Sequence, residues 1–427
     1  PNRAIITSKW GEIETAEVKK DTQVRYLGGV KSPILTEVKK SDKVTVLEDE
    51  DDWMKVATAD GYVGYIKTKF LKNQKKEKTS RDFTEPVYSD MTEDHSINMA
   101  WHNVTNAAAN NAVQQVLAST SGLTTIAPTW FSLADTEGNI SSIADADYVN
   151  YAHTAGLEVW AVFRDFHGGT NSYDETYETL RYTSKRAKLE DQVVAAAVAA
   201  GVDGINLDFE LISSKCGVHY VQLVRELSVK CHQNNLVFSV DNYVPQSYNS
   251  HYDLKEQGIV ADYVVIMAYD EHTEGSYEAG SVASISYLQD GIEKTLKKVS
   301  ADKVIAGIPF FTRLWFETAK SPEQLSEEAG TEAASYPNKV SSKALGMEEA
   351  AQSVVNAGAT AQWDEKTQQN YAKWSADGGT YRIWLEDAQS LEAKLKVIQE
   401  NKLAGVAEWS LGKEESSVWK LISQYVN

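Results

Sequence analysis

The segment that decides the fold reads Gly201-Val202-Asp203-Gly204-Ile205-Asn206-Leu207-Asp208-Phe209-Glu210. From Ile205 onward its apolar and polar residues alternate. Side chains of a β-strand point alternately to its two faces, so Asn206, Asp208 and Glu210 share one face. Burial of two carboxylates costs several kcal/mol unless they are paired. An inward-facing row of acids therefore indicates a functional site.

Eight short apolar segments alternate with longer helical patterns between residue 90 and the C-terminus. The predicted strands are 97–101, 125–131, 158–163, 204–209, 237–243, 263–268, 304–309 and 405–409. Helical patterns between them include 180–200, 218–233 and 285–299. This alternation predicts an α/β fold, a (β/α)8 TIM barrel whose interior receives the acidic row. A solvent-facing strand of a two-layer sheet would alternate in the same way, but the other seven strands are of the parallel type.

A long gap before the last predicted strand carries a pattern of its own, at about residues 316–380. Its strand-like runs are 359–364, 370–374 and 381–385. They predict a small α+β insertion that contains a hairpin. Insertions in such barrels lie on the loops at the face where active sites are built. We therefore expect the insertion to wall one side of a cleft.

Residues 1–72 consist of short β segments between turns. Residues 73–89 are polar and are predicted to be a linker. The barrel domain is predicted to span residues 90–427. The motifs of the first part are Asp52-Trp53-Met54-Lys55-Val56 and Gly61-Tyr62-Val63-Gly64-Tyr65-Ile66. They resemble those of bacterial SH3-like domains, which are small all-β barrels. The resemblance implies attachment to the bacterial cell wall. The alternative is a passive structural appendage.

Composition and charge exclude several classes of function. The 427 residues contain 42 Lys and Arg against 61 Asp and Glu, a net charge of -19, so no nucleic-acid partner is expected. Residues 1–81 hold 17 basic and 13 acidic residues, a net +4, which leaves -23 for residues 82–427. No apolar stretch reaches the ~20 residues of a membrane span. The chain opens at Pro1, which we interpret as a processed or trimmed product.

No sequence feature indicates a cofactor or a metal site. The only cysteines are Cys216 and Cys231, which match no metal or redox spacing and are expected to be free thiols. The eight histidines never form His-Glu-x-x-His, and no Gly-x-Ser-x-Gly or phosphate-binding glycine loop occurs. We therefore expect a reaction that needs neither metal nor cofactor.

The acidic segment resembles the Asp-x-x-Asp-x-Asp-x-Glu signature of family 18 glycoside hydrolases, the chitinases and related N-acetylglucosaminidases. Asp203, Asp208 and Glu210 match its first, third and fourth acids, and Asn206 stands at the second. Two further matches are Ile266-Met267-Ala268-Tyr269-Asp270-Glu271-His272 and Ala407-Glu408-Trp409. Three further segments resemble the branch of the family that acts on peptidoglycan and spore cortex. They are Pro128-Thr129-Trp130-Phe131, Gly307-Ile308-Pro309-Phe310-Phe311-Thr312-Arg313 and Tyr381-Arg382-Ile383-Trp384-Leu385-Glu386-Asp387.

The resemblance implies a retaining, substrate-assisted hydrolysis, in which the substrate's own acetamido group is the nucleophile. Glu210 would be the general acid and then the general base. Asp208 would orient the acetamide and raise the pKa of the acid. Tyr269 would donate to the acetamide oxygen, and Trp409 would form the apolar floor under the reacting sugar.

Further residues are expected to contact the sugar. Asp270, Met267 and Arg313 are assigned to the cleft wall and the sugar hydroxyls. Asn206 and Asp203 belong to the acidic motif. Two tryptophans at the ends of the first two predicted strands are either sugar platforms or core packing: Trp101 and Trp130. Tyr269 and Trp409 have the same alternative as core aromatics, and Asp270 has that of a helix N-cap.

The sequence thus predicts an extracellular or cell-wall-associated hydrolase of β-1,4 bonds next to N-acetylated hexosamines. Peptidoglycan or cortex is the favoured partner, and chitin is the alternative. A non-catalytic chitin- or peptidoglycan-binding lectin is a second alternative, although the presence of Glu210, Asp208 and Tyr269 argues against it. A third, in which the acidic barrel only docks a partner, leaves the inward carboxylates unexplained.

Overall fold

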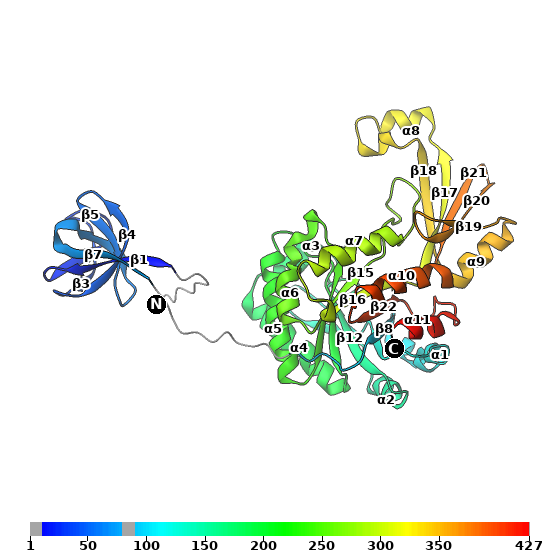
Figure 1. Ribbon diagram of the computed structural model, residues 1–427, viewed down its shortest axis with the longest axis horizontal. Helices are drawn as coiled ribbons and strands as arrows, with labels where there is room; N and C mark the ends of the chain where they lie inside the picture. Colours follow the sequence, from blue (N-terminus) through cyan, green and yellow to red (C-terminus); the bar gives the residue numbers. More distant parts are fainter. Residues whose placement is uncertain (1–10, 79–89, 427) are drawn as a thin grey trace. The chain divides into compact units, whose positions relative to one another are not determined.

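The computed structural model describes residues 11–78 and 90–426. The chain divides into two compact units, residues 1–87 and 88–427 (Figure 1). Each unit has its own buried apolar core.

The N-terminal unit is one antiparallel sheet of seven strands, in the order β3-β2-β6-β5-β4-β1-β7. Its strands are β1 (Glu12–Val18), β2 (Thr22–Arg25), β3 (Ile34–Val38), β4 (Lys43–Glu50), β5 (Trp53–Ala57), β6 (Val63–Lys67) and β7 (Leu71–Lys78). A turn lies between β5 and β6, where Gly61 has a φ of 85°. Alternate residues such as Val24, Val56 and Ile66 fill the core. This unit is the all-β SH3-like domain expected from its motifs.

The predicted linker begins later than its composition indicated. Residues 73–78 belong to β7, which pairs antiparallel with β1 at the edge of the sheet. An edge strand with exposed side chains needs no apolar period, so its run of charges resembled a linker. The remainder of the predicted linker, residues 79–89, lies outside the described residues.

The second unit contains a closed barrel of eight parallel strands, which confirms the predicted fold class. Its strands are β8 (Ile97–His102), β9 (Thr125–Pro128), β12 (Glu158–Arg164), β13 (Gly204–Asp208), β14 (Val237–Tyr243), β15 (Tyr263–Met267), β16 (Val304–Pro309) and β22 (Gly405–Trp409). Pairing of β9 with both β8 and β12 closes the ring. The predicted strand at 125–131 is divided, and its end starts a hairpin of β10 (Phe131–Leu133) and β11 (Ile140–Ser142).

Helices surround the barrel (Figure 1). They are α1 (Val113–Leu117), α2 (Ala146–Thr154), α3 (Tyr173–Leu180), α4 (Thr183–Ala200), α5 (Gly217–Gln233), α6 (Leu254–Val260), α7 (Ile285–Leu296), α10 (Ala388–Glu400) and α11 (Val418–Val426). The helix predicted at 180–200 corresponds to α4, with α3 ending just before it. None of the helices in the described ranges has the length and apolar character to cross a membrane.

The two faces of β13 divide as the alternation predicted. Ile205 and Leu207 belong to the apolar layer between the barrel and its helices. Asn206 and Asp208 are buried on the other face. The interior below them is filled by a separate apolar cluster that includes Trp160. The acids therefore lie at the upper end of a packed barrel.

The insertion is a five-stranded antiparallel sheet between β16 and β22, in the order β18-β17-β21-β20-β19. Its elements are β17 (Phe311–Ala319), α8 (Pro322–Glu327), β18 (Asn338–Gly346), α9 (Met347–Asn356), β19 (Gln362–Asp364), β20 (Gln369–Ala376) and β21 (Gly379–Leu385). Figure 1 shows this sheet standing out from the barrel, with α8 at its far end. It begins before residue 316 because β17 starts directly after β16, so the two strands read as one apolar run.

A buried ion pair anchors the insertion to the barrel helices. Lys394 of α10 contacts both carboxylate oxygens of Glu386, at 3.0 and 2.9 Å. Glu386 also accepts from Gln369 of β20 and Ser390 of α10. The two charged side chains are 1% and 0% exposed. Every oxygen of the buried carboxylate therefore has a partner.

Candidate active site

A cleft lies at the carboxyl ends of the barrel strands, the face on which barrel enzymes build their active sites. Residues from β8, β9, β12, β13, β14, β15 and β22 or the turns just after them line it. They are Trp101, Thr129, Arg164, Phe166, Asp208, Glu210, Asp241, Tyr243, Met267, Tyr269, Asp270 and Trp409. Of the residues predicted from the sequence, Glu210, Asp208, Tyr269, Trp409, Asp270, Met267 and Trp101 thus share one cavity.

Glu210 lies just beyond the end of β13 and is held from two sides. Its backbone N–H donates to Asp165 Oδ1 at 2.9 Å. The hydroxyl of Tyr243 donates to its Oε2. Burial raises the pKa of Glu210, the charge of Asp270 raises it further, and the hydrogen bond from Tyr243 lowers it. A carboxyl in this position is suited to carry a proton and to give it up.

Asp165 fixes the backbone on which Glu210 stands. It is fully buried and accepts from the N–H groups of Glu210 and Leu211 and from the Thr176 hydroxyl. Burial raises the pKa of Asp165 to about 7 despite these bonds. Its role is to orient the turn rather than to contact a ligand, because it does not line the cleft.

Asp208 and Asp241 form a buried carboxyl pair below Glu210. Burial raises the pKa of Asp208 well above its usual range, as do the charges of Glu210 and Asp241. Burial raises the pKa of Asp241 to about 8. Asp208 Oδ1 and Asp241 Oδ2 are both buried without a hydrogen-bond partner among the described residues. These two oxygens are available to a proton or to a polar group of a ligand.

Asn206 links the pair to the aromatic wall. Its amide group donates to Asp241 Oδ1 at 2.7 Å and to Ser239 Oγ at 2.9 Å, and its oxygen accepts from Trp101 Nε1 at 3.0 Å. It is fully buried and does not line the cleft. Asn206 therefore acts on a substrate only through Asp241 and Trp101.

Three aromatic rings give the cleft an apolar side. Trp101 packs edge-on against Trp409, with 6.0 Å between centroids, and against Tyr269 at 6.4 Å. Trp409 is the more exposed indole, whereas Trp101 is only 2% exposed. Trp409 is thus the ring that a ligand can cover, with Trp101 as its support.

Besides Asn206, three residues predicted from the sequence lie outside the cleft. Trp130 is 2% exposed and packs on Tyr148, with its indole N–H bonded to Asn110, so the structure places it in the core. Asp203 precedes β13 and is bonded to His153 and to the Val159 N–H, at the opposite end of the strand. Asp203 precedes Asp208 by five residues, which in a β-strand corresponds to a distance of ~16 Å.

Arg313 is the third of these residues and stands in β17 of the insertion. It donates to Ser342 Oγ at 2.9 Å. Burial raises the pKa of Asp270, and the charges of Arg313 and Lys413 lower it. Arg313 is therefore close to the cleft and acts on it through Asp270.

Several lining residues were not predicted from the sequence, notably Asp241, Tyr243 and Arg164. A signal for the first two was present, because Ser239, Asp241 and Tyr243 alternate with apolar or amide residues in β14. That alternation is the same one that identified the acids of β13. Arg164 is the last residue of β12, and no alternation of polar and apolar residues in the sequence marks it as a cleft residue.

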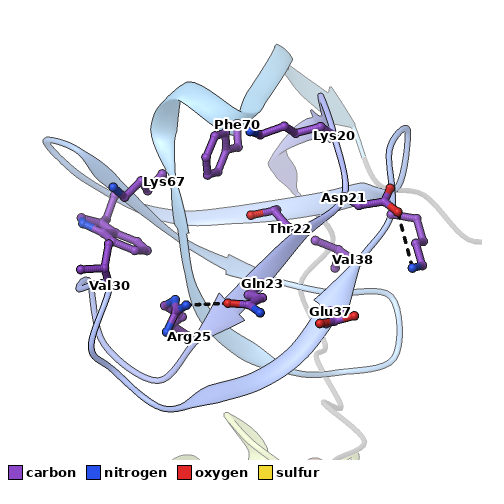
Figure 2. Close-up of a pocket in the computed structure, with 12 residues that line it drawn as sticks. Lys20, Asp21, Thr22, Gln23, Arg25, Val30, Glu37, Val38, Lys67 and Phe70 are labelled. Atoms are coloured by element: carbon purple, nitrogen blue, oxygen red, sulfur yellow. Dashed lines mark hydrogen bonds and ion pairs between the residues drawn. The ribbon is translucent and has the colours of Figure 1, made fainter.

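The N-terminal unit has a larger cavity, a groove of about 420 Å³. Figure 2 shows Lys67 and Val30 on one side, Glu37 and Val38 on the other, and Thr22 and Gln23 between them. Lys20 Nζ lies 4.4 Å from the centre of the Phe70 ring, and Lys67 Nζ lies 5.5 Å from that of Trp53. Four cations and two acids line the groove. It holds no buried acid pair, so we assign it to binding and not to catalysis.

Comparisons with known proteins identify the families of the two units. The sequence profile of glycosyl hydrolases family 18 matches residues 162–414, and that of the bacterial SH3 domain matches residues 19–72. A protein described as an uncharacterized glycosylase, YvbX of Bacillus subtilis, is 26% identical over 67% of this chain and 80% of its own length. A cortical fragment-lytic enzyme of Bacillus subtilis is 27% identical over 57% of this chain and 54% of its own length.

Solved structures share the fold of the second unit. The C-terminal domain of a putative chitinase from Desulfitobacterium hafniense superposes with a TM-score of 0.67. The match covers 78% of this chain and all of that domain, at 19% identity. At that identity the likeness concerns the fold alone.

Proposed function

The chain belongs to family 18 of the glycosyl hydrolases, and from this premise we propose that it is a retaining, substrate-assisted hydrolase of β-1,4 glycans that contain N-acetylglucosamine. The observation that carries the proposal is the position of Glu210 above the Asp208 and Asp241 pair. All three carboxyls have a raised pKa, and two of their oxygens are buried and unused.

In the first step Glu210 gives its proton to the glycosidic oxygen while the bond from that oxygen to the anomeric carbon breaks. The acetamido oxygen of the same sugar forms a bond to the anomeric carbon and closes an oxazolinium ring. The buried carboxyl pair receives the acetamide N–H, because Asp208 lines the cleft and its Oδ1 has no hydrogen-bond partner among the described residues. The Asp208 and Asp241 pair shares one proton, and the single negative charge that it keeps stabilises the developing positive charge of the ring.

In the second step Glu210, now a carboxylate, takes a proton from water. The water oxygen attacks the anomeric carbon, the oxazolinium ring opens and the acetamide is restored. Two displacements at one carbon retain its configuration. Glu210 ends the cycle protonated, as it began.

Four further cleft residues position the sugar. Tyr269 presents its hydroxyl from the end of β15 to the acetamide carbonyl oxygen, and Trp409 receives the CH face of the pyranose. Met267 and Asp270 form the wall beside them. The sugar would thus be recognised by one apolar surface and a few polar groups, as is usual for sites that bind small ligands.

Peptidoglycan or spore cortex is the substrate that we propose, and chitin is the alternative. The relative described as cortical fragment-lytic supports the former. The fold shared with a putative chitinase keeps the latter open. We further propose that the N-terminal groove binds the bacterial cell wall and that the protein acts outside the cell. The cationic lining supports this, since wall polymers carry phosphate and carboxylate groups.

The test compares Glu210→Gln with the parent enzyme on purified peptidoglycan, cortex fragments and chitin oligosaccharides, with the released ends identified by mass spectrometry. Glutamine keeps the size of the side chain but cannot give up a proton, so kcat should fall by about 10² to 10⁴-fold while binding persists. Glu400→Gln is the matched control, because Glu400 is an exposed acid at the end of α10. Unchanged turnover in Glu210→Gln would exclude the mechanism. Sugar binding without turnover by the parent enzyme would instead favour the lectin.

A further inference from the structure

Arg164 is a cation inside the proposed catalytic cleft to which the mechanism gives no role. It is the last residue of β12, and the strand register places it beside Asp208 of β13. Trp160 and Val162, four and two residues before it, belong to the apolar cluster inside the barrel. Side chains two apart in a strand share a face, so Arg164 continues that inward row and reaches the cleft.

The guanidinium of Arg164 has unused hydrogen-bond donors. Across residues 11–78 and 90–426 it makes no hydrogen bond and no ion pair, and its Nε is buried without a partner. Its contact is with the ring of Phe166, whose centre lies 5.6 Å from Arg164 Cζ. A guanidinium has five N–H donors, and leaving a buried donor unpaired costs free energy. An outside partner in the cleft would remove that cost.

The other two cations near the cleft differ from Arg164. Neither Arg313 nor Lys413 lines the cleft, and the charges of both act on Asp270. Arg313 donates to Ser342, although its Nε is also buried without a partner among the described residues. Arg164 feels the charge of Asp208 without a hydrogen bond to it. Its planar fork matches a carboxylate in a bidentate geometry, which no neutral sugar hydroxyl reproduces.

The charge of the surrounding domain sets a condition for an acidic substrate. Residues 82–427 carry a net charge of -23, so an acidic substrate is repelled as it approaches. A neutral glycan needs no cation in the cleft. An anionic glycan needs one, fixed near the reacting sugar.

We propose that Arg164 is a specificity-determining residue that binds a carboxylate carried by the glycan and so makes the cleft selective for acidic peptidoglycan over neutral chitin. The inference rests on the proposed hydrolase function and adds the charge of its substrate. Two sources carry this group in peptidoglycan. One is the lactyl ether acid of the muramic sugar, and the other is a carboxylate of the attached peptide.

The experiment measures kcat/KM of the full chain and of Arg164→Met on four soluble substrates. The first is a peptidoglycan glycan strand without peptides, the second the same strand with peptides, the third the strand with its carboxylates amidated, and the fourth a chitin oligosaccharide. Arg164→Lys tests the need for the fork. Arg225→Met is the matched control, because that arginine lies on the outer helix α5 and pairs with Glu256.

We expect Arg164→Met to lose about 10 to 100-fold in kcat/KM on the charged strands and at most a few-fold on the neutral substrates. A loss on the first strand assigns the lactyl acid, and a loss confined to the second assigns the peptide. An equal loss on charged and amidated strands, together with a shifted pH profile, would show that Arg164 only tunes Asp208 and would overturn this inference alone. Failure of the parent enzyme on all four substrates would overturn the proposed function with it.

Discussion

Glu210 works in the proposed mechanism only while it can start each cycle protonated, so its neighbours set the pH range of activity. Two of them act in opposite directions. The Tyr243 hydroxyl donates to the ionised carboxylate and lowers its pKa, whereas the charge of Asp270 disfavours ionisation and raises it. Since activity is lost as pH rises through the pKa of the acid, the alkaline limb of the rate profile reports this balance.

We predict that Tyr243→Phe moves the alkaline limb of kcat/KM to higher pH and that Asp270→Asn moves it to lower pH. The first variant removes a bond to the charged form, so the acid holds its proton longer. The second removes a like charge, so the proton leaves earlier. The pH dependence of kcat/KM on one soluble oligosaccharide measures both shifts. If the alkaline limbs of the two variants moved in the same direction, the assignment of Glu210 as the acid would be contradicted.

Single residues were predictable from the sequence where local alternation marks a face. The inward row of β13 was found because its polar side chains interrupt apolar ones within one strand. The partner of Glu210 was not, because Tyr243 lies on the neighbouring strand and only the closed barrel brings the two together. Trp130 could not be placed either, since the residue that takes its N–H, Asn110, belongs to a different element.

Among the elements, α10 and the end of the inserted sheet depend on one buried ion pair. Glu386 has its oxygens satisfied by Lys394, Gln369 and Ser390. Burial nevertheless raises the pKa of Glu386, against the lowering effect of Lys394. The pair therefore fixes the junction between the insertion and the barrel only while both members are present.

We predict that Lys394→Met lowers the free energy of unfolding by about 3 to 5 kcal/mol at neutral pH, because it leaves a buried carboxylate without its cation. The loss should grow with rising pH, since a buried carboxyl whose pKa is raised in the folded state costs stability as it ionises. Denaturant unfolding measures it. The control is Lys396→Met, an exposed lysine on the same helix, and a loss no larger than that of the control would refute the prediction.

Element boundaries show where sequence reasoning reaches its limit. The eight barrel strands were predicted because each is a short apolar run bounded by turns. The start of the insertion was misplaced because β17 follows β16 with only Phe310 between them, and nothing in the local composition separates a barrel strand from a strand that leaves the barrel. The edge strand β7 was missed for the complementary reason that it is almost entirely polar.

For the molecule as a whole, charge and site type divide between the two units. The first carries a cationic groove and a net charge of +4 over residues 1–81, and the second carries the acidic barrel. This division could be predicted from composition alone. The groove could not, because its lining comes from strands and turns that are dispersed in the sequence.

We predict that removal of residues 1–87 weakens retention on purified walls and leaves hydrolysis of soluble oligosaccharides within about two-fold. The barrel has its own core and its own cleft, so chemistry should not depend on the first unit. Retention of the full chain should fall with rising salt as the cationic groove is screened. Sedimentation with purified walls measures the retained fraction of protein. Equal retention of the full chain and the truncated chain would argue against anchoring by the first unit.

The place of the inserted sheet has a consequence for how this barrel can diversify. The strands β16 and β22 are neighbours in the ring, and the entire sheet is one excursion between them. The closing entropy of such an excursion grows only slowly with its length. The size and the surface of the inserted sheet can therefore change, by evolution or by grafting, while the order of the barrel strands and the row of acids remain the same. The junction between β16 and β22 is thus a suitable position for replacing the insertion without altering the catalytic residues.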